Sequence, residues 1–431
     1  MPQRGRTVLS RFDERSGQNA FVVWAGSGGG LIAVVEDFVV RGTGNGQSIY
    51  ALGTLDLSEG EPMVIQAPAG VQGFVMSAWQ PLEDIGPLGP DHNEGGAFLL
   101  LPPGYDVEVP DGYYAVRCDT FLVVWVVRGM LKDGRPDAAV QAIKGMRIYP
   151  LTTRHDPPAM SFADLTRVAA TLLPVGEDLD GIAYFEHLAT VVQREPTREQ
   201  DKQFLGMLAA LGIEHDTAFA PDERLRAILT RAAHAGHVMT AALAFDSRSE
   251  AKLRWPGRSQ WEEVFLTPHV DFEAPNVVEL DARAALYYQA LGESKGALLD
   301  IVEAASKYAA LFKDADGAPL RGANSYQLRV PANVPAKSFW SVTVYDAQTR
   351  SMIDNAQGIS GRDSYQSTLQ TNDDGTVDLH LGPEPPADHE DNWIQTNPGV
   401  GFFLYFRWYG PLETYFDKTW VLPDVQTLER R

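Results

Sequence analysis

The pattern of apolar and polar positions changes twice along the chain. From about residue 17 to 150, short apolar or alternating runs are separated by Gly, Pro, Asp and Asn, which is typical of β-strands joined by turns. The predicted strands are Ala20–Trp24, Leu31–Val40, Met63–Gln66, Gly73–Trp79, Ala97–Leu101 and Thr120–Arg128. An N-terminal β domain is therefore expected.

Between about residues 160 and 245 the spacing becomes helical. Ser161–Asp164 and Thr197–Gln200 both have the S/T-x-x-D/E/Q form of a capping box, which predicts that a helix begins at each. Apolar residues then recur at i, i+3, i+4 and i+7 from Phe204 and again from Leu225. A further helical stretch is predicted from about Leu280 to Phe312.

The strand pattern returns after this helical middle. The predicted strands are Tyr326–Val330, Phe339–Tyr345, Val377–Leu381 and Phe402–Trp408. We therefore expect an α+β multidomain protein, with an N-terminal antiparallel β-sandwich or barrel (residues 1–155), a helical middle domain (156–320) and a C-terminal antiparallel, jelly-roll-like β-sandwich (321–431). A length of 431 residues agrees with several domains, since a single core stops growing at about 250–300 residues.

The two β portions resemble copies of each other. The matching segments are Met63–Ala69 with Tyr326–Ala332, Phe74–Gln80 with Trp340–Asp346, Phe98–Pro102 with Leu379–Pro383, and Phe121–Gly129 with Phe402–Gly410. Four matches in the same order favour a duplicated β unit over a coincidence of strand patterns. The duplication predicts that Trp79 corresponds to Tyr345 and Arg128 to Arg407.

Residues near the C-terminal end also match the pattern of a known family. They are Asp316-Gly317, Leu320, Gly322, Tyr326, Phe339-Trp340-Ser341, Tyr345-Asp346, Asp374-Gly375, Gly382-Pro383, Asn392-Trp393, Arg407, Tyr409, Trp420 and Pro423. A looser N-terminal set is Tyr50, Leu55-Asp56-Leu57, Pro68, Gly95-Gly96, Pro103-Gly104 and Arg117. Over about residues 40 to 430 the chain therefore resembles the two-domain proteins in which domain of unknown function 1254 precedes domain of unknown function 1214.

The resemblance implies an architecture and no particular reaction. It implies an N-terminal β domain, a helical middle and a C-terminal β-sandwich, in agreement with the residue patterns. One position departs from the family's N-terminal motif, Asn-x-Asp-Thr-x-Tyr, because Gln47 stands where the family has aspartate.

The net charge and the length of the apolar runs limit which partners the protein is expected to bind. The chain carries 36 Lys and Arg against 57 Asp and Glu, a net charge of −21, and shows no basic stripe for nucleic-acid phosphates. Its apolar runs are far shorter than the roughly 20 residues of a membrane span. The basic N-terminus is not followed by an apolar segment, so no secretory signal is predicted. We expect a cytoplasmic protein that binds neither nucleic acid nor membrane, and a homo-oligomer is left open.

Standard cofactor and metal motifs are missing from the sequence. One cysteine, Cys118, excludes an internal disulfide and any site that needs two cysteine ligands. His234 and His237 lie three apart on a predicted helix, but they are interpreted as solvent-facing or packed. Asp314–Gly317 is interpreted as a turn, and the acidic loop His389–Asp391 as solvated charge. We expect no metal and no cofactor.

The candidate catalytic residues lie on the echoed C-terminal strands. Tyr345 and Asp346 end a predicted strand, where a phenol and a carboxylate can act as general acid or base. A capping role at a turn is the alternative for Asp346. Arg407 lies inside an apolar strand, and a buried arginine has to be paired or ligand-bound. Its alternatives are an ion pair, with Asp346 or Asp56, and recognition of an anion.

Aromatic and amide side chains are the candidate substrate-binding residues. They are Trp79, Trp340, Asn392, Trp393 and Tyr409. Core packing is the alternative for the tryptophans.

These residues support a cofactor-independent enzyme of hydrolase or lyase type, which acts on a small organic or sugar-like substrate by acid–base catalysis in an interdomain cleft. The first alternative is a non-catalytic protein that binds a small molecule or carbohydrate, and the second is a structural role in an assembly.

Overall fold

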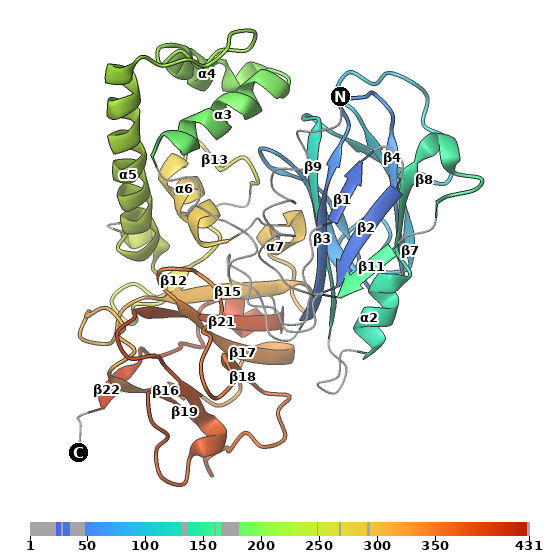
Figure 1. Cartoon of the computed structure of the whole chain (residues 1–431). Coiled ribbons are helices and arrows are strands. Elements are labelled where there is room, and N and C mark those ends of the chain that lie inside the picture. The colour runs from blue at the N-terminus through green and yellow to red at the C-terminus, as the bar shows by residue number, and fades with distance from the viewer. Residues whose placement is uncertain are drawn as a thin grey trace. The chain divides into compact units, whose positions relative to one another are not determined.

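The computed structural model describes residues 23–26, 29–34, 48–130, 137–158, 161–164, 181–247, 249–266, 269–290 and 294–428. The chain divides into two compact units: unit 1 comprises Met1–Phe38 and Ser48–Thr240, and unit 2 comprises Val39–Gln47 and Ala241–Arg431. Both units contain strands and helices (Figure 1). The predicted division into three domains at residues 155 and 320 stays a prediction.

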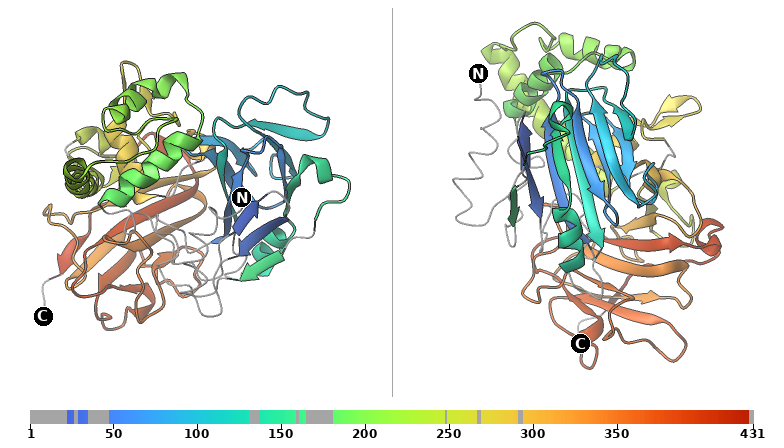
Figure 2. Two further views of the ribbon diagram at one scale, coloured as in Figure 1. Left: turned by 45° about the horizontal axis from the view of Figure 1, so that its top comes forward. Right: turned by 90° about the vertical axis from the view of Figure 1, so that its right-hand side faces the viewer.

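Unit 1 contains a sandwich of two sheets. The larger sheet has the strand order β11-β2-β1-β3-β9-β5-β6 and the smaller one β10-β4-β7-β8 (Figures 1 and 2). The strands are β1 Val23–Gly26, β2 Gly29–Val34, β3 Ser48–Asp56, β4 Met63–Pro68, β5 Gln72–Ser77, β6 Pro81–Ile85, β7 Gly95–Leu101, β8 Tyr113–Arg117, β9 Leu122–Met130, β10 Arg147–Pro150 and β11 Ser161–Asp164. Helix α2 (Asp137–Lys144) lies between β9 and β10 in the chain.

The core of this sandwich follows from the period of two along its strands. Val123, Trp125 and Val127 of β9 are each 0% exposed and pack with Ile65 and Phe98 of the smaller sheet. Alternate side chains of a strand point to opposite faces of a sheet, so these three residues turn one face of β9 inward. Arg128, next in the chain, therefore lies on the outer face.

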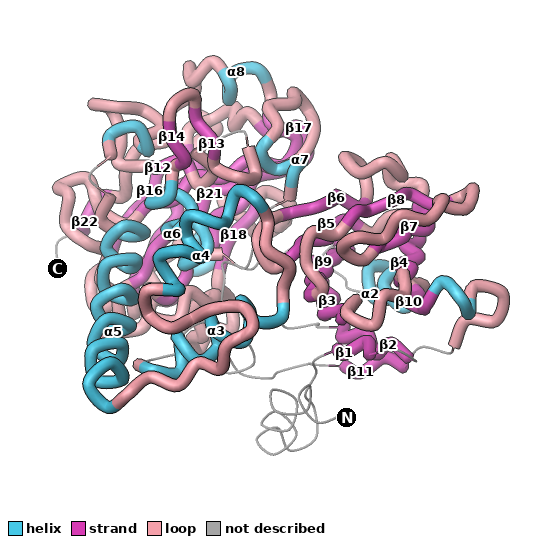
Figure 3. Tube along the Cα trace, turned by 90° about the horizontal axis from the view of Figure 1, so that it is seen from above, coloured by secondary structure: helices cyan, strands magenta, loops and turns pink. Residues whose placement is uncertain are grey.

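Three helices of unit 1 pack on one another beside the sandwich (Figure 3). They are α3 Ile182–Arg194, α4 Lys202–Ala209 and α5 Glu223–Phe245, the last of which continues into unit 2. The carboxylate of Glu195, at the end of α3, accepts hydrogen bonds from the backbone N–H groups of Phe121 (2.5 Å) and Leu122 (3.1 Å). Arg198 donates to Asp119 at 2.7 Å. These contacts tie the helices to the start of β9.

Unit 2 contains the second sandwich. Its larger sheet has the order β12-β15-β21-β17-β18 and its smaller sheet β20-β19-β16-β22. The strands are β12 Glu262–Glu263, β15 Ser306–Leu311, β16 Ser325–Val330, β17 Ala336–Asp346, β18 Gly361–Asp363, β19 Val377–Gly382, β20 Trp393–Gln395, β21 Phe402–Pro411 and β22 Gln426–Leu428, with a separate hairpin of β13 Glu273–Ala274 and β14 Val277–Val278. The helices are α6 Leu280–Gln289, α7 Lys295–Leu298 and α8 Glu413–Phe416.

The two sandwiches share one topology. In the larger sheets, β3-β9-β5-β6 of unit 1 corresponds to β15-β21-β17-β18 of unit 2. In the smaller sheets, β10-β4-β7-β8 corresponds to β22-β16-β19-β20, and each ends in a parallel pair, β7 with β8 and β19 with β20. A helix also precedes each of the corresponding strands β10 and β22, namely α2 and α8. All four sequence matches fall on corresponding strands, so the predicted duplication is confirmed as a repeat of topology.

Strand register tests the two predicted residue correspondences. Arg128 pairs with Tyr50 and Gln72, and Arg407 pairs with Tyr308 and Ser341 at the same place in the larger sheet. Each arginine lies opposite a tyrosine of the neighbouring strand, β3 or β15, which agrees with the predicted correspondence of Arg128 with Arg407.

The predicted correspondence of Trp79 with Tyr345 cannot hold together with that of Arg128 with Arg407. Tyr345 pairs with Phe403, four residues before Arg407. Four residues before Arg128 is Val124, which pairs with Met76. If the two arginines are aligned, Met76 and not Trp79 corresponds to Tyr345.

Two predicted helical segments are strands instead. Ser161–Asp164 forms β11 and pairs in parallel with β2, so its capping-box pattern does not begin a helix there; the residues that follow lie outside the described ranges. Ser306–Leu311 forms β15 and pairs with six residues of β21. Pairing with a central, fully buried strand outweighs the local helical spacing of its alanines.

The described sheets stay open, so the sandwich alternative is confirmed for the N-terminal β domain and the barrel is not. Within the described ranges, the helices are too short or too polar to cross a membrane.

Candidate functional site

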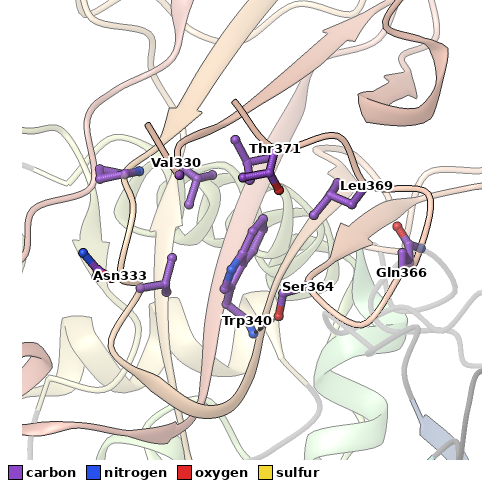
Figure 4. A pocket seen from close by; sticks show the side chains of 11 residues that line it. Val330, Asn333, Trp340, Ser364, Gln366, Leu369 and Thr371 are labelled. Atoms are coloured by element: carbon purple, nitrogen blue, oxygen red, sulfur yellow. Dashed lines mark hydrogen bonds between the residues drawn. The ribbon is translucent and has the colours of Figure 1, made fainter. Parts of the chain in front are cut away.

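A cavity of about 260 Å³ lies in unit 2 beside Trp340 of β17. Its apolar walls come from the end of β16, the start of β19 and the loops that join the strands, with Val330, Val334, Leu369 and Val377 among them. Figure 4 shows the indole of Trp340 in the middle of the residues that line the cavity. No charged side chain lines it.

Trp340 is held from one side and presents its ring to the cavity. Its indole stacks on Phe406 of β21, with ring centroids 5.4 Å apart and planes 15° apart. The Trp340 backbone N–H donates to Ser364 Oγ at 3.1 Å, which fixes the loop after β18 against β17. The indole is 7% exposed, so a ligand would meet a rigid aromatic surface.

Polar atoms at the cavity are few. Gln366 Oε1 is buried and, within the described ranges, accepts no hydrogen bond. A buried acceptor without a donor is unfavourable, and a hydroxyl or N–H group of a ligand would satisfy it. Asn333, Ser364 and Thr371 add amide and hydroxyl groups. The arrangement suits an uncharged molecule that has one apolar face and hydrogen-bond donors.

A second group of chemistry-bearing residues lies on the larger sheet of unit 2, around Arg407. Arg407 is 2% exposed. Its Nη2 donates to the hydroxyl of Tyr345 at 2.6 Å and its Nη1 to Thr343 Oγ1 at 3.1 Å. The rings of Tyr308, Tyr345 and Tyr405 have their centroids 5.2, 5.6 and 5.3 Å from the guanidinium carbon.

The hydroxyl groups of nearby tyrosines favour the charged form of Arg407. Burial acts to lower the pKa of the guanidinium, but the hydroxyls of Tyr345, Tyr409 and Tyr308 raise it above its ordinary value. Arg407 is therefore a fixed cation on the sheet face opposite to the sandwich core.

The two carboxylates considered as ion-pair alternatives for Arg407 have other partners in the structure. The Asp346 carboxylate accepts the backbone N–H groups of Gln348 (2.7 Å) and Thr349 (2.9 Å), which is the turn-capping alternative. Asp56 pairs with Arg194 at 2.6 Å.

Of the three predicted catalytic residues, the structure brings Tyr345 and Arg407 together and leaves Asp346 apart. Consecutive side chains of a strand point to opposite faces, so Asp346 lies on the other side of β17 from Tyr345.

Among the predicted substrate-binding residues, Trp340 alone lines the cavity. Asn392 is 2% exposed, and its side chain bonds the backbone of Gln370 and Asp378. Trp393 donates from Nε1 to the carbonyl of Gly382 at 2.9 Å. Both side chains therefore have a structural role in unit 2, because they bond its backbone.

The two remaining predicted residues lie elsewhere. Tyr409 stacks on Phe339, with centroids 3.8 Å apart and planes 10° apart. Trp79 belongs to unit 1, where the Arg198 guanidinium lies over its ring at 5.8 Å.

Sequence reasoning missed two titratable groups near the Arg407 face. Glu262 of β12 pairs with Ala310, which pairs with Tyr405, so all three share the face of Arg407. Burial raises the pKa of Glu262 to about 7, although Lys252 and Lys313 act in the opposite direction. Neither Glu262 nor Lys252 belongs to a motif, and only the assembled sheet shows that they are buried.

Lys252 has a related environment. It is 8% exposed, and its Nζ donates to the carbonyl of Leu243 at 3.0 Å. Burial lowers the pKa of its ammonium group. A carboxyl and an amine whose pKa values are moved towards neutrality are characteristic of acid–base sites.

Within the described ranges, no three or more His, Cys, Asp or Glu side chains form a cluster for a metal ion. His234 and His237 are exposed on α5. The Asp314 carboxylate accepts the backbone N–H groups of Asp316 and Ala318 and the hydroxyl of Thr427, so the predicted turn is confirmed there.

Comparison with known proteins gives a domain pair and a fold. The family described as "Protein of unknown function (DUF1254)" matches residues 35–150, and "Protein of unknown function (DUF1214)" matches residues 305–413. No curated protein matches the chain.

Two solved structures are similar to the chain. The crystal structure of the VPA0106 protein from Vibrio parahaemolyticus is 18% identical, with a TM-score of 0.56 over 90% of both chains. A putative uncharacterized protein from Burkholderia cenocepacia is 12% identical, with a TM-score of 0.44 over 90% of this chain and 78% of that one. The first likeness shows the fold and leaves the activity open.

Proposed function

The chain belongs to the family in which DUF1254 precedes DUF1214, and on that premise we propose that unit 2 binds a small uncharged organic molecule, such as a sugar, in the cavity beside Trp340. One observation carries the proposal: a supported indole and a buried acceptor without a partner, Gln366 Oε1, line one uncharged cavity.

The size of the cavity limits the ligand. Its volume of about 260 Å³ lies just below the ~300–1,000 Å³ of pockets that hold drug-sized ligands. A monosaccharide or a small ring compound is therefore the expected class. Its apolar face would pack on Trp340 and a hydroxyl or N–H group would donate to Gln366 Oε1.

Calorimetric titration of the full chain with a panel of neutral sugars and small ring compounds tests the proposal, with small carboxylates as the charged comparison. We expect binding of a neutral compound that Gln366→Leu weakens by roughly tenfold, since one hydrogen bond to a buried acceptor is lost. Gln370→Leu is the matched control, because its exposed side chain does not line the cavity. Equal affinity of both variants for every bound compound contradicts the proposed site.

A second candidate function is an acid–base enzyme of hydrolase or lyase type, and the environment of Glu262 favours it. A carboxyl with a pKa of about 7 can accept and return a proton near neutral pH, and it shares a sheet face with the cation Arg407. Analysis of each bound compound for products separates the two candidates. Consumption that Glu262→Gln abolishes supports the enzyme, whereas binding without consumption supports the binding protein.

A further inference from the structure

Helix α5 has apolar residues on two of its faces, and one of these faces is exposed. The first face packs Leu225, Leu229 and Ala233 into the apolar cluster that α5 shares with α3 and α4. The second face repeats apolar residues at steps of four, three, four and three positions, which keeps them on one side of the helix. Its members, all exposed, are Ile228, Ala232, Ala235, Met239 and Ala242. We call this face the α5 stripe.

The α5 stripe offers a substantial apolar surface to solvent. Met239 is 66% exposed, Ile228 is 37% exposed, and the neighbouring Val238 is 53% exposed. Large apolar side chains gathered on one exposed face are characteristic of surfaces that bind another macromolecule.

The charges beside the α5 stripe are positive. Arg224 lies four positions before Ile228 and Arg231 lies three positions after it, so both share its face, and both are exposed. From Arg224 to Phe245 the helix contains no aspartate or glutamate. The chain as a whole has a net charge of −21. The α5 stripe is therefore a basic, apolar surface on an acidic protein.

A second exposed apolar surface, in unit 2, has the opposite charge. The hairpin of β13 and β14 leads into α6 and exposes Val277 (56%), Val278 (44%) and Leu280 (46%). Glu273 lies opposite Val278 in the hairpin, Glu279 follows Val278 in the chain, and both glutamates are exposed. We call residues 273–280 the hairpin patch.

We propose that copies of this chain associate through contact of the α5 stripe of one copy with the hairpin patch of another. The two surfaces are complementary, because each is apolar and their charges are opposite. This local attraction counteracts the repulsion between two chains that each carry a net charge of −21. Contact between two α5 stripes is not expected, since it would bring Arg224 and Arg231 of both copies together.

Sedimentation velocity of the full chain tests the proposal. We expect the unaltered protein to sediment with the mass of at least two chains. Arg224→Glu/Arg231→Glu should reduce it to one chain, because like charges then face each other in the contact. Glu273→Lys/Glu279→Lys should do the same from the other surface. All four side chains are exposed, so the substitutions spare the cores of both units.

Mixing the two charge-reversed variants makes the test specific. An equimolar mixture should associate again, because the acidic α5 stripe of one variant meets the basic hairpin patch of the other. A misfolded variant would not regain this association. Arg147→Glu/Arg258→Glu is the matched control, since it makes the same change in net charge at exposed positions outside both surfaces. The control should sediment like the unaltered chain.

The apolar part of the contact has its own variants. Met239→Ser and Val278→Ser change no charge, and each should weaken association by at least tenfold because an exposed apolar side chain that the contact buries is lost. A mass of one chain for the unaltered protein overturns the proposal and assigns the two surfaces to another partner. A mixture of charge-reversed variants that stays dissociated overturns it as well, and so does dissociation of the Arg147→Glu/Arg258→Glu control.

Discussion

Arg128 and Arg407 lie on corresponding strands, β9 and β21, of two sandwiches of the same topology, and each is opposite a tyrosine. Each lies on an inner strand of its larger sheet, and the tyrosine opposite it, Tyr50 or Tyr308, belongs to the neighbouring strand β3 or β15. Each also follows a run of alternate residues that fill its own sandwich core, so it lies on the outer face. The repeat thus preserves a cation beside a phenol, away from the core.

The bond between Arg407 and Tyr345 is expected to stabilise unit 2. Tyr345→Phe removes the hydroxyl that accepts from Nη2 at 2.6 Å and leaves a buried charged donor short of one partner. The free energy of unfolding should fall by about 1.5–3 kcal/mol, the range for a hydrogen bond to a charged group. Denaturant unfolding measures it. Tyr365→Phe is the control, because Tyr365 is 66% exposed, and equal losses in the two variants would contradict this role.

Glu262 should make stability depend on pH. Its pKa rises from 4.5 to about 7 on folding, so the unfolded chain releases this proton at lower pH than the folded chain does. The stability that the protonated carboxyl provides is fully present below about pH 4.5 and is lost as the pH rises through about 7. Glu262→Gln should be roughly 1–3 kcal/mol more stable relative to the unaltered chain at pH 8 than at pH 4.5. A difference that is constant over this range refutes the assignment.

The contacts of Glu195 are expected to stabilise unit 1. Its side chain is buried and accepts hydrogen bonds from the N–H groups of Phe121 and Leu122, so Glu195→Ala leaves two half-buried donors without this acceptor. We expect a loss of about 2–4 kcal/mol in the free energy of unfolding, measured by urea denaturation. Glu199→Ala is the matched control, since the Glu199 side chain is 86% exposed and its ion pair is with exposed Lys202. A change below 1 kcal/mol in Glu195→Ala contradicts this reading of the contact.

Two glycines should respond to alanine in opposite directions. A Cβ atom at Gly322 would lie 2.0 Å from the carbonyl oxygen of Asn397, a backbone atom, so Gly322→Ala requires the loop to move and should destabilise unit 2. Gly236 lies within α5 and has no atom within 4 Å of a Cβ, so Gly236→Ala should stabilise the helix by about 0.5–1 kcal/mol. Thermal unfolding of the two variants compares them, and a rise in Tm for Gly322→Ala would show that the contact is relieved at little cost.

The strands of both sandwiches were predictable because their burial depends on alternation within each segment. The matches between Met63–Ala69 and Tyr326–Ala332, and between Phe98–Pro102 and Leu379–Pro383, even carried the correct register of β4 with β7 and β16 with β19. Ser306–Leu311 was wrong, because its strand form depends on pairing with β21, nearly one hundred positions away in the sequence. Local spacing cannot report a partner at that distance.

The candidate site residues were predictable only where the local pattern of a single strand made the residue conspicuous. Tyr345 was found because it ends a predicted strand beside Asp346, and Arg407 was found because it lies inside an apolar strand that matches the strand of Arg128. Glu262 was missed because its pKa depends on burial by residues far along the chain. The cavity beside Trp340 was missed as a cavity for the same reason, since its walls come from separate segments between Val330 and Val377.

Because Cys118 is buried, the rate at which its thiol reacts with a reagent measures how often the surrounding sandwich unfolds. Its sulfur lies in the core of the first sandwich, and burial and the charge of Asp119 raise the pKa of the thiol to about 12. An alkylating reagent attacks the thiolate, so it reacts only when that sandwich opens. Because the sequence has one cysteine, the labelling rate depends on unfolding of the N-terminal sandwich. It does not respond to unfolding of the C-terminal sandwich. Comparing the labelling rate of Cys118 with the rate of overall unfolding therefore shows which of the two sandwiches unfolds first.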